Sequence, residues 1–412
     1  MNCEIDGISF PLEQPASVAD LCKLVRNIPV SGLAIYPVGG RTLLDLGLPP
    51  TRDGIAIDTT QLDRVIDYPS RDMTITVEAG IRVGKLQEIL KAEGQRLPVD
   101  VPRRAEATLG GAIATNVSGP RRFGFGTFRD YVIGISVVDA DGNESKAGGR
   151  VVKNVAGYDL CKLYTGSLGT LGIITQVTLK LRPLPEASAV VWIKLEEAEQ
   201  AAAALDRLVV SRTRPIAIEL LSPAAADHVT HAIGQPLPPA PLVLVVGFED
   251  NAEAVKWQID QLQTELEDLK VWRQAFEAVD ADPIWQALVE FQALQPNRVT
   301  FKANIRRSGV VEFFDAAQRQ ATHWALQSHT GNGIVYGHAS SGSDEADVRT
   351  SLTKLRTLAV ALQGNLVIRR CPNEWKTDLV VWGEPRGDSW LMQAIKRKLD
   401  PLNLLNPGRF VG

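Results

Sequence analysis

The distribution of glycine constrains the fold of this 412-residue chain more than any other feature. Glycines crowd between Gly32 and Gly172, and up to about residue 183 short apolar runs typical of β-strands alternate with glycine-rich loops. Three loops stand out, at Pro37–Thr42, Thr108–Gly119 and Thr165–Gly172. Glycine after a strand lets backbone N–H groups approach an anion closely, as a pyrophosphate requires. Any one of these clusters, taken alone, is equally well explained as a turn.

The two common nucleotide-binding fingerprints are missing. No G-x-G-x-x-G motif joins a strand to a helix, and Gly80-Ile-Arg-Val-Gly84-Lys85 is too short for a P-loop. A Rossmann dehydrogenase and a P-loop nucleoside triphosphatase are therefore disfavoured, and a bound dinucleotide requires another fold. The net charge of −4 argues against nucleic-acid binding, which leaves a basic footprint in the composition.

The spacing of the cysteines and the hydropathy of the chain indicate the cellular compartment. The four cysteines are scattered without a C-x-x-C pair, which disfavours a zinc ribbon or a disulfide scaffold and fits a reducing cytoplasm. The longest uncharged apolar run, Leu237–Phe248, is too short to cross a bilayer, and no secretory signal is visible at Met1. We expect a cytoplasmic protein, with any contact to the inner membrane made through partners.

The pattern of predicted elements changes near Arg182-Pro-Leu-Pro185, after which predicted strands alternate with predicted helices. This order predicts helices packed on one face of an antiparallel sheet, a ferredoxin-like α+β arrangement in one copy or two. The predicted strands are 190–194, 215–221, 242–247, 299–305, 334–336 and 366–370, and the predicted helices are 196–210, 251–266, 311–327 and 347–362.

The glycine loops, in this order and spacing, resemble the FAD-binding domain of the vanillyl-alcohol-oxidase/p-cresol-methylhydroxylase (PCMH) superfamily. Segments Gly119–Gly134 and Gly149–Leu160, with the ending Leu405–Phe410, resemble the smaller FAD-binding subunits of bacterial glycolate oxidases. The resemblance implies an α+β fold in two parts. Residues 1–183 would form the PCMH-type FAD-binding domain, to which residues 395–412 return, and residues 186–394 an α+β cap or substrate domain.

The resemblance also implies which residues hold FAD. The pyrophosphate would lie in the first loop, on Pro37, Val38, Gly39, Gly40, Arg41 and Thr42. The second loop would supply opposing backbone donors from Thr108, Leu109, Gly110 and Gly111, with Ala114, Asn116, Ser118 and Gly119 nearer the ribityl chain and ring. Asn154, Gly157 and Asp159 belong to a third signature, in contact with FAD or bracing the loop. The adenosine half of FAD would be bordered by Gly169, Gly172, Ile173 and Ile174. Asn406 would close over the cofactor.

One departure from the family pattern concerns the flavin attachment. Members with covalent flavin place a histidine just after the Gly-Gly of the first loop, where this chain has Arg41. No cysteine lies between Cys22 and Cys161, so the second anchor of some relatives is missing too. Cys161 itself lies in an apolar stretch and is interpreted as a buried structural residue. The sequence therefore predicts non-covalent FAD.

A flavin dehydrogenase of a 2-hydroxy acid needs a cation for the carboxylate and a base for the hydroxyl proton. His338, in Gly337-His-Ala-Ser-Ser-Gly342, resembles an incomplete copy of the relatives' Gly-His-x-Gly-x-Gly-x-x-His segment and is the candidate catalytic base. A lone histidine at a strand end is more often structural. His228 and His231 lack a third ligand, and we expect no metal. The candidate carboxylate-binding residues are Lys302, Arg306, Arg307, Arg369 and Arg370, among which the sequence does not choose.

The resemblance implies a subunit of a glycolate oxidase that oxidises glycolate to glyoxylate, with a larger FAD-binding subunit and an iron–sulfur subunit as partners. An iron–sulfur centre would belong to a partner, because no cluster-binding set of cysteines exists here. Two alternatives remain open. One is a stand-alone FAD-dependent dehydrogenase of D-lactate or another 2-hydroxy acid. The other is a non-catalytic subunit that relays electrons or stabilises the complex.

Overall fold

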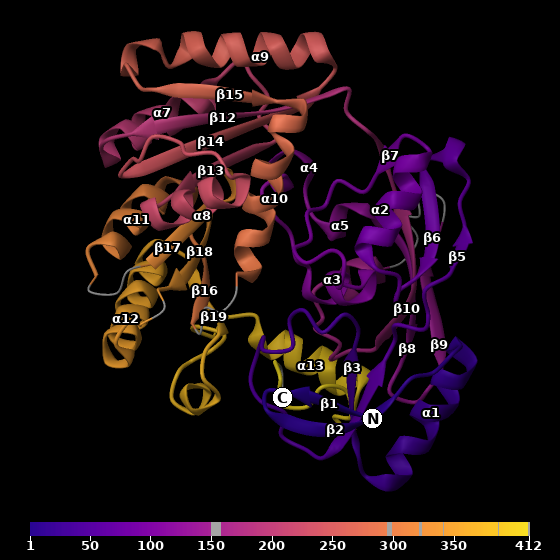
Figure 1. Ribbon diagram of the computed structural model, residues 1–412. Coiled ribbons are helices and arrows are strands. Elements are labelled where there is room, and N and C mark those ends of the chain that lie inside the picture. Colours follow the sequence, from indigo (N-terminus) through magenta and orange to yellow (C-terminus); the bar gives the residue numbers. More distant parts are fainter. Residues whose placement is uncertain (150–157, 295–298, 321–323, 341, 386, 411–412) are drawn as a thin grey trace.

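The computed structural model describes residues 1–149, 158–294, 299–320, 324–340, 342–385 and 387–410. Figure 1 shows two parts side by side, one rich in short strands and loops and the other built on a long sheet covered by helices. The sheets of the first part lie within residues 2–183, and the long sheet lies within residues 187–370. The expected α+β fold in two parts is confirmed.

The described residues of the first part form two principal sheets and six α-helices. Its strands are β1 (Asn2–Ile5), β2 (Ile8–Glu13), β3 (Ala34–Val38), β4 (Gly54–Asp58), β5 (Val65–Asp67), β6 (Thr74–Glu78), β7 (Gln95–Arg96), β8 (Val132–Val138), β9 (Glu144–Gly148), β10 (Ile173–Lys180) and β11 (Arg182–Pro183). Its helices are α1 (Val18–Ser31), α2 (Val83–Ala92), α3 (Leu109–Thr115), α4 (Arg122–Phe125), α5 (Phe128–Tyr131) and α6 (Leu160–Tyr164). The strand orders are β1-β2-β4-β3 and β5-β6-β10-β8-β9, and β7 pairs separately with β11.

Apolar periodicity explains how these helices pack. In α2, Val83, Leu86 and Leu90 recur on one face and are buried in the same core as Val77 of β6 and Val177 of β10. Beyond α2, Gly94 has a φ of +67°, a left-handed conformation that glycine adopts without strain. Helix α2 therefore ends where its apolar face ends.

The second part is one eight-stranded sheet with helices on both faces. Its elements are β12 (Ala187–Leu195), α7 (Ala198–Val210), β13 (Ala217–Leu221), α8 (Pro223–Ile233), β14 (Leu242–Asp250), α9 (Ala252–Glu265), β15 (Arg273–Glu277), α10 (Asp282–Glu290), β16 (Thr300–Asn304), α11 (Val310–Gln318), β17 (Trp324–His329), β18 (Ile334–Ala339), α12 (Glu345–Ala361) and β19 (Asn365–Arg370). The strand order is β15-β12-β14-β13-β17-β18-β16-β19.

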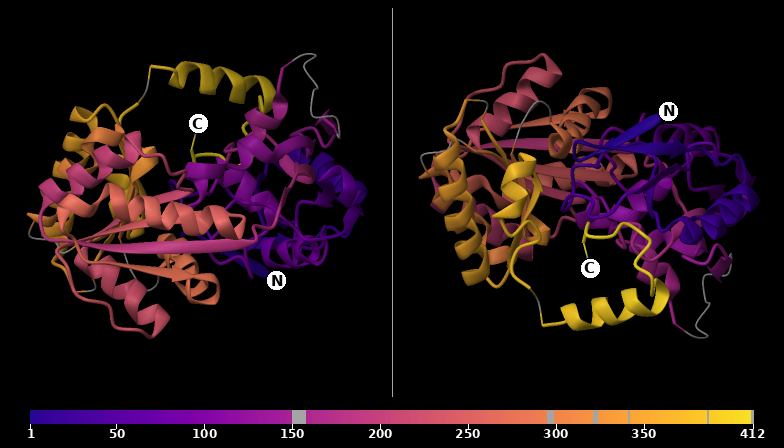
Figure 2. Two further views of the ribbon diagram at one scale, coloured as in Figure 1. Left: turned by 90° about the horizontal axis from the view of Figure 1, so that it is seen from above. Right: turned by 90° about the horizontal axis from the view of Figure 1, so that it is seen from below.

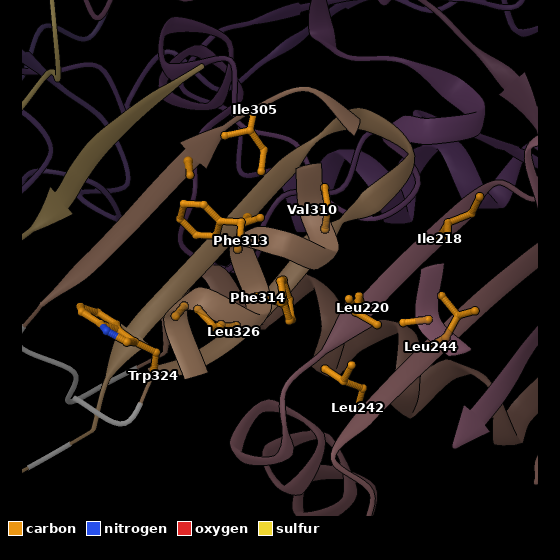
Figure 3. Close-up of a cluster of buried hydrophobic side chains, with 14 of the residues drawn as sticks. Ile218, Leu220, Leu242, Leu244, Ile305, Val310, Phe313, Phe314, Trp324 and Leu326 are labelled. Carbon is orange, nitrogen blue, oxygen red and sulfur yellow. The ribbon is translucent and has the colours of Figure 1, made fainter. Parts of the chain in front are cut away.

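This order is a ferredoxin-like unit present twice. In each half, the four strands taken in chain order lie in the spatial order 4-1-3-2, and β13 pairs antiparallel with β17 to join the halves. Helices α7, α9, α11 and α12 cover one face, where Leu220, Leu244 and Phe313 pack in a continuous core (Figure 3). Helices α8 and α10 cover part of the other face. Helices α8 and α10 leave the rest of that face uncovered, so polar residues can lie there.

One predicted helix is wrong. The sequence predicted a helix over residues 311–327, but α11 ends at Gln318 and β17 begins at Trp324. Trp324 and Leu326 are buried, and Gln327 and His329 are buried on the opposite face, so the segment alternates as a strand does. Pairing with both β13 and β18 outweighs the weak local preference of this segment for either structure.

The C-terminal segment returns to the first part, with helix α13 (Ser389–Leu399) running along the side of the molecule in Figure 2. Lys396, buried in α13, donates to the carbonyl oxygens of Thr170 and Leu405 at 2.9 and 2.8 Å and to Asp400 Oδ2 at 2.5 Å. Beyond it, the Ile35 amide of β3 donates to Leu404 O at 2.7 Å. The C-terminal segment thereby extends the edge of the first sheet.

Candidate functional site

A pocket in the first part is lined by all three glycine loops and by the returning C-terminal segment. Most residues that the sequence singled out lie on its wall. They are Pro37, Val38, Gly39, Gly40, Arg41, Thr42, Thr108, Gly110, Gly111, Ala114, Gly169, Gly172, Ile173, Ile174 and Asn406.

Close packing explains why the first loop needs glycine. A Cβ built on Gly39 would lie 2.2 Å from the Thr108 hydroxyl, and one on Gly40 would lie 2.0 Å from the carbonyl oxygen of Glu106. These distances are far below any real contact, so the first and second loops meet only because no side chain stands between them. The two loops therefore form one continuous backbone surface on the pocket wall.

Arg41 is fixed within this surface. Its φ is +55°, and its guanidinium donates to Asp58 Oδ2 at 2.9 Å. Burial alone would raise the pKa of Asp58, but hydrogen bonds from Thr60, Gln14 and Arg41 lower it below its ordinary value. Asp58 is therefore a carboxylate that holds Arg41 in place at neutral pH.

Several residues expected at the site lie off the pocket wall. Leu109 is buried in the core, Asn116 ends α3 with a φ of +47°, and Asp159 accepts from the Lys162 amide at the start of α6. Gly119 packs against Asp100, and Ser118 does not line the pocket. Asn154 and Gly157 fall outside the described residues. These positions support the loops, and their contact with a cofactor stays a prediction.

The pocket also contains residues that sequence reasoning missed. Arg103, Gln292, Ala293, Trp382 and Arg409 lie on its wall. They come from separate segments without a glycine signature, so only the folded chain brings them together. Arg409 donates to the Leu46 and Leu48 carbonyl oxygens at 2.8 and 3.0 Å, and it fixes the loop that follows Thr42.

Three cations lie around Tyr336 and form a group that we call the cation cluster: Arg122, Lys302 and Arg369. Arg369 lines the pocket itself. In β19 the pairing with β16 shifts from Arg370 to Ile368, so Arg369 is an extra residue in a β-bulge. The bulge lets Arg369 and Arg370 line, with Thr300, a smaller pocket beside the first.

Hydrogen bonds connect the cation cluster to the second glycine loop. Arg369 donates to Gln292 Oε1 at 3.2 Å, and the Gln292 amide donates to the Ser118 carbonyl oxygen at 2.6 Å. Arg122 donates to the Ser118 hydroxyl at 2.9 Å. Ser118 therefore links two of the three cations, although it does not line the pocket.

Tyr336 lies at the centre of the cation cluster. It pairs with Lys302 across β16 and β18, and its ring centroid lies 5.8 Å from Lys302 Nζ and 5.4 Å from the Arg369 guanidinium. Burial lowers the pKa values of Arg122 and Arg369 and raises that of Tyr336. Burial, with the charges of Arg122 and Arg369, lowers the pKa of Lys302 to about 7.

The cation cluster makes no ion pair within the residues that the structure describes. No carboxylate in that part of the chain pairs with Arg122, Lys302 or Arg369, whereas Arg370 pairs with Asp45 at 2.5 Å. Arg306 and Arg307 are exposed beyond the end of β16. Of the five cations suggested by the sequence, the structure thus brings Lys302 and Arg369 together, and it adds Arg122.

The two buried histidines near the cation cluster differ in their partners. His338 packs edge-on against the Phe291 ring at 4.7 Å and lines neither pocket. Burial, then the charge of Arg369, lowers the pKa of His338 to about 3, so it is neutral. His329 bonds through Nδ1 to the buried Glu219 at 2.8 Å. A catalytic role for His338 stays a prediction.

The fold and the pocket define a two-domain FAD-binding oxidoreductase of the PCMH type. Residues 12–148 match the FAD binding domain model, and residues 184–410 match the model of the FAD linked oxidases, C-terminal domain. The chain belongs to the FAD-linked oxidases, a family that binds FAD. The expected cofactor is therefore confirmed.

Three known proteins are similar to this chain in sequence or in fold. It is 26% identical over 413 residues to the glycolate oxidase subunit GlcD of Bacillus subtilis (strain 168), covering 96% of this chain and 87% of that protein. It is 37% identical over 151 residues to the glycolate oxidase subunit GlcE of Escherichia coli (strain K12), covering 36% of this chain and 43% of that protein. The 4-ethylphenol oxidase from Gulosibacter chungangensis shares the fold, with a TM-score of 0.72 over 97% of this chain and 89% of that chain at 14% identity.

These matches refine the expected subunit type. Of the two glycolate oxidase subunits, GlcD, the larger one, is matched along nearly the whole chain, and the match to GlcE covers just over a third of the chain. Within the described residues, no helix has the length and apolarity needed to cross a bilayer, and no group of three potential metal ligands occurs.

We expect the FAD to be released when the purified protein is precipitated with acid. No cysteine, histidine or tyrosine is among the described residues that line the pocket, so no usual covalent anchor for a flavin faces it. The measurement is the flavin absorbance of the supernatant and of the washed, redissolved pellet. Flavin that stays with the denatured chain would show a covalent link.

Gly111→Val should weaken FAD binding by about 5–150-fold, which corresponds to the ~1–3 kcal/mol of a forced overpacking. Gly111 lines the pocket, and a Cβ there would meet only the Thr108 hydroxyl, at 3.1 Å, so the chain itself can accept the substitution. Gly110→Val is the contrasting variant, because its Cβ would lie 2.9 Å from Ala79 Cβ and should destabilise the core. FAD titration and thermal unfolding of both variants separate the effects. Unchanged affinity in Gly111→Val would place the cofactor elsewhere.

Proposed function

We propose that this chain oxidises a small 2-hydroxy acid with FAD as the electron acceptor, as part of a glycolate oxidase that converts glycolate to glyoxylate. The observation that carries the proposal is the cation cluster at one end of the glycine-loop pocket. Three cations meet there without a carboxylate partner in the described chain, and one of them, Arg369, faces the pocket. Partly buried charges without a counter-charge are costly, so a bound anion is the natural ligand.

FAD would be held by the glycine loops. The pyrophosphate would lie on the joined surface of Pro37–Thr42 and Thr108–Gly111, with Gly169–Ile174 and Asn406 on the opposite wall. The backbone supplies donors there without bulky side chains, which suits a diphosphate. Ala114, together with Ser118 behind the wall, would mark the direction of the ring, because Ser118 accepts hydrogen bonds from Gln292 and from Arg122 of the cation cluster. FAD, when bound, supplies the hydride acceptor.

The substrate carboxylate would bind at Arg369. A guanidinium matches both oxygens of a carboxylate, and Gln292 already fixes one Nη of Arg369 at 3.2 Å. Arg122, fixed by Ser118, would add a second positive charge. Binding at Arg369 would put the carboxylate at the side of the pocket nearest to Tyr336. The hydroxyl-bearing carbon would then lie between Arg369 and the cofactor.

Anaerobic reduction of the bound flavin tests this function without knowledge of the final electron acceptor. We expect glycolate or D-lactate to bleach the oxidised flavin, and ethylene glycol, which lacks the carboxylate, to react at least about 10²-fold more slowly, the value of a lost charged pairing. Equal rates with the acid and the neutral alcohol would contradict the carboxylate site. No reaction with any 2-hydroxy acid would contradict the function.

The subunit assignment rests on the names of the two relatives, GlcD and GlcE. A larger FAD-binding subunit and an iron–sulfur subunit are the proposed partners, and an affinity-tagged chain expressed with its neighbouring genes should retain both. Recovery of this chain alone, with full flavin reduction by D-lactate, would favour the stand-alone dehydrogenase instead.

A third assignment, an accessory flavoprotein that relays electrons, is favoured by one observation. His338, the remnant of the relatives' histidine segment, is buried against Phe291 rather than exposed to the pocket. An accessory subunit would contain FAD but show no direct reduction by substrate when its partner is absent. The anaerobic experiment therefore separates this assignment from the first two.

A further inference from the structure

Gln292 is a buried amide that lines both the glycine-loop pocket and the smaller pocket beside it. It is 6% exposed and lies in the short 3₁₀ helix η4 (Phe291–Ala293), directly after α10. Phe291 is fully buried in the same core as α8 and α10. The core therefore holds the backbone of Gln292 in place at the pocket wall.

The two ends of the Gln292 amide contact different parts of the molecule. Its Oε1 accepts from the Arg369 guanidinium at 3.2 Å, and its Nε2 donates to the Ser118 carbonyl oxygen at 2.6 Å. A guanidinium only donates and a carbonyl oxygen only accepts, so a single orientation of the amide satisfies both bonds. Gln292 therefore fixes Arg369, on β19, relative to Ser118, in the second glycine loop.

Arg369 depends on this contact for its orientation. Among the hydrogen bonds of the described residues, the one from Arg369 goes to Gln292. The Tyr336 ring, 5.4 Å from the guanidinium, attracts the charge but does not set which N–H groups face the pocket. A guanidinium pairs best with a carboxylate through two parallel N–H donors, so its orientation decides how well such a ligand binds.

The neutrality of Gln292 matters as much as its position. A carboxylate in its place would bond Arg369 more strongly, but it would also cancel the charge that attracts an anionic ligand. Asp45 does so to the neighbouring Arg370, with which it pairs at 2.5 Å in the smaller pocket. The amide of Gln292 instead orients Arg369 and leaves its positive charge available.

We infer that Gln292 is a positioning residue that aims the guanidinium of Arg369 at the substrate carboxylate and makes the site selective for acids over neutral alcohols. The inference rests on the proposed function. Because Gln292 bonds both Arg369 and the second glycine loop, this one side chain sets the position of the carboxylate relative to the cofactor loops.

Gln292→Glu is the first test, because glutamate has nearly the same size and shape. The new carboxylate would pair with Arg369 and could not donate to the Ser118 carbonyl oxygen. We expect the KM for glycolate or D-lactate in anaerobic flavin reduction to rise by about 10²-fold, with the maximal rate within about threefold. Reduction by ethylene glycol, which has no carboxylate, should also stay within about threefold, whereas general damage to the site would slow both reactions.

Oxalate binding gives a readout that does not depend on turnover. Oxalate is a carboxylate of substrate size without a hydride to lose, and calorimetry measures its Kd for the FAD-loaded protein. We expect this Kd to rise by about 10²-fold in Gln292→Glu but only by about 10-fold in Gln292→Leu, which removes both hydrogen bonds and leaves Arg369 charged. Gln263→Glu is the matched control, because Gln263 is exposed on α9 outside both pockets and its change should be within about twofold.

A double-mutant cycle separates a role through Arg369 from a structural role. In the Arg369→Met protein, Gln292→Leu should change the KM by less than about twofold, because no guanidinium remains to be oriented. Two losses that multiply would overturn the inference, since independent effects on folding or on the pocket wall are additive in free energy.

Two further results would overturn the role of Gln292 and leave the proposed function intact. One is a rise in KM of less than about threefold in Gln292→Glu, and the other is oxalate binding to Gln292→Glu at least as tightly as to Gln292→Leu. An unaltered protein that no 2-hydroxy acid reduces would overturn the proposed function, and the role of Gln292 with it.

Discussion

Arg369→Met is expected to lower kcat/KM for the 2-hydroxy acid by about 10²–10³-fold, which corresponds to ~3–4 kcal/mol for the loss of one partner of a buried charge pair. Arg369 is the member of the cation cluster that lines the pocket, and methionine keeps much of its length without its charge. Because the contact is to the non-reacting carboxylate, most of the loss should appear in KM. The measurement is the rate of flavin reduction over a range of substrate concentrations.

Arg307→Met is the matched control for Arg369→Met. Arg307 is exposed beyond β16 and contacts neither pocket, so its loss should leave the kinetics within about twofold. If this chain were an accessory flavoprotein, Arg369→Met would leave the glycolate oxidation of the complex unchanged. That outcome, in a protein with its full complement of FAD, would contradict the assignment of the carboxylate site.

Glu249→Leu is expected to destabilise the protein by about 3–5 kcal/mol, the cost of removing one partner of a buried ion pair. Glu249, on β14, is 2% exposed and pairs with Arg96 at 2.6 Å and Arg121 at 2.7 Å. Both arginines belong to the first part of the molecule, so the carboxylate joins the two parts. Its loss would leave two buried guanidinium groups, with Arg121 keeping only Asp100 at 3.0 Å.

Chemical denaturation of the FAD-loaded protein measures this loss, in the first transition if the two parts unfold separately. Glu253→Gln is the control, because Glu253 is exposed in the first turn of α9 and its change should be within about 0.5 kcal/mol. A loss below about 1 kcal/mol for Glu249→Leu would show that the two parts are held together mainly by apolar contacts.

The sequence predicted the glycine-loop pocket well because its signals are local. Glycine is required where two backbone segments meet within the reach of a Cβ, as they do at Gly39 and Gly40, and such glycines can be recognised in the sequence itself. The ferredoxin-like order of the second part was predicted from the alternation of strands and helices. Strand β17 was not, because Trp324–His329 becomes a strand through its neighbours β13 and β18.

The cation cluster could not be selected from the sequence for a geometric reason. Lys302 pairs with Tyr336 and Val367 on neighbouring strands, and Arg369 follows Val367 on the same face, so these residues meet through strand pairing that the sequence does not show. Arg122 lies in a different domain and reaches Tyr336 through tertiary packing alone. The sequence thus suggested the right kinds of residue, and the fold decided among them.

The returning C-terminal segment orders the events of biosynthesis. Strand β3 is an edge strand, and the amide and carbonyl of Ile35, which bond to Leu404 O and the Asn406 amide, have no such partner until those residues have been made. Asn406 and Arg409 also line the pocket, so the ribosome completes the eight-stranded sheet before the cofactor site can close. A nascent chain halted before Asn406 would expose a bare strand edge, a site for aggregation. If the flavin lies in this pocket, its capture requires translation to have reached Arg409.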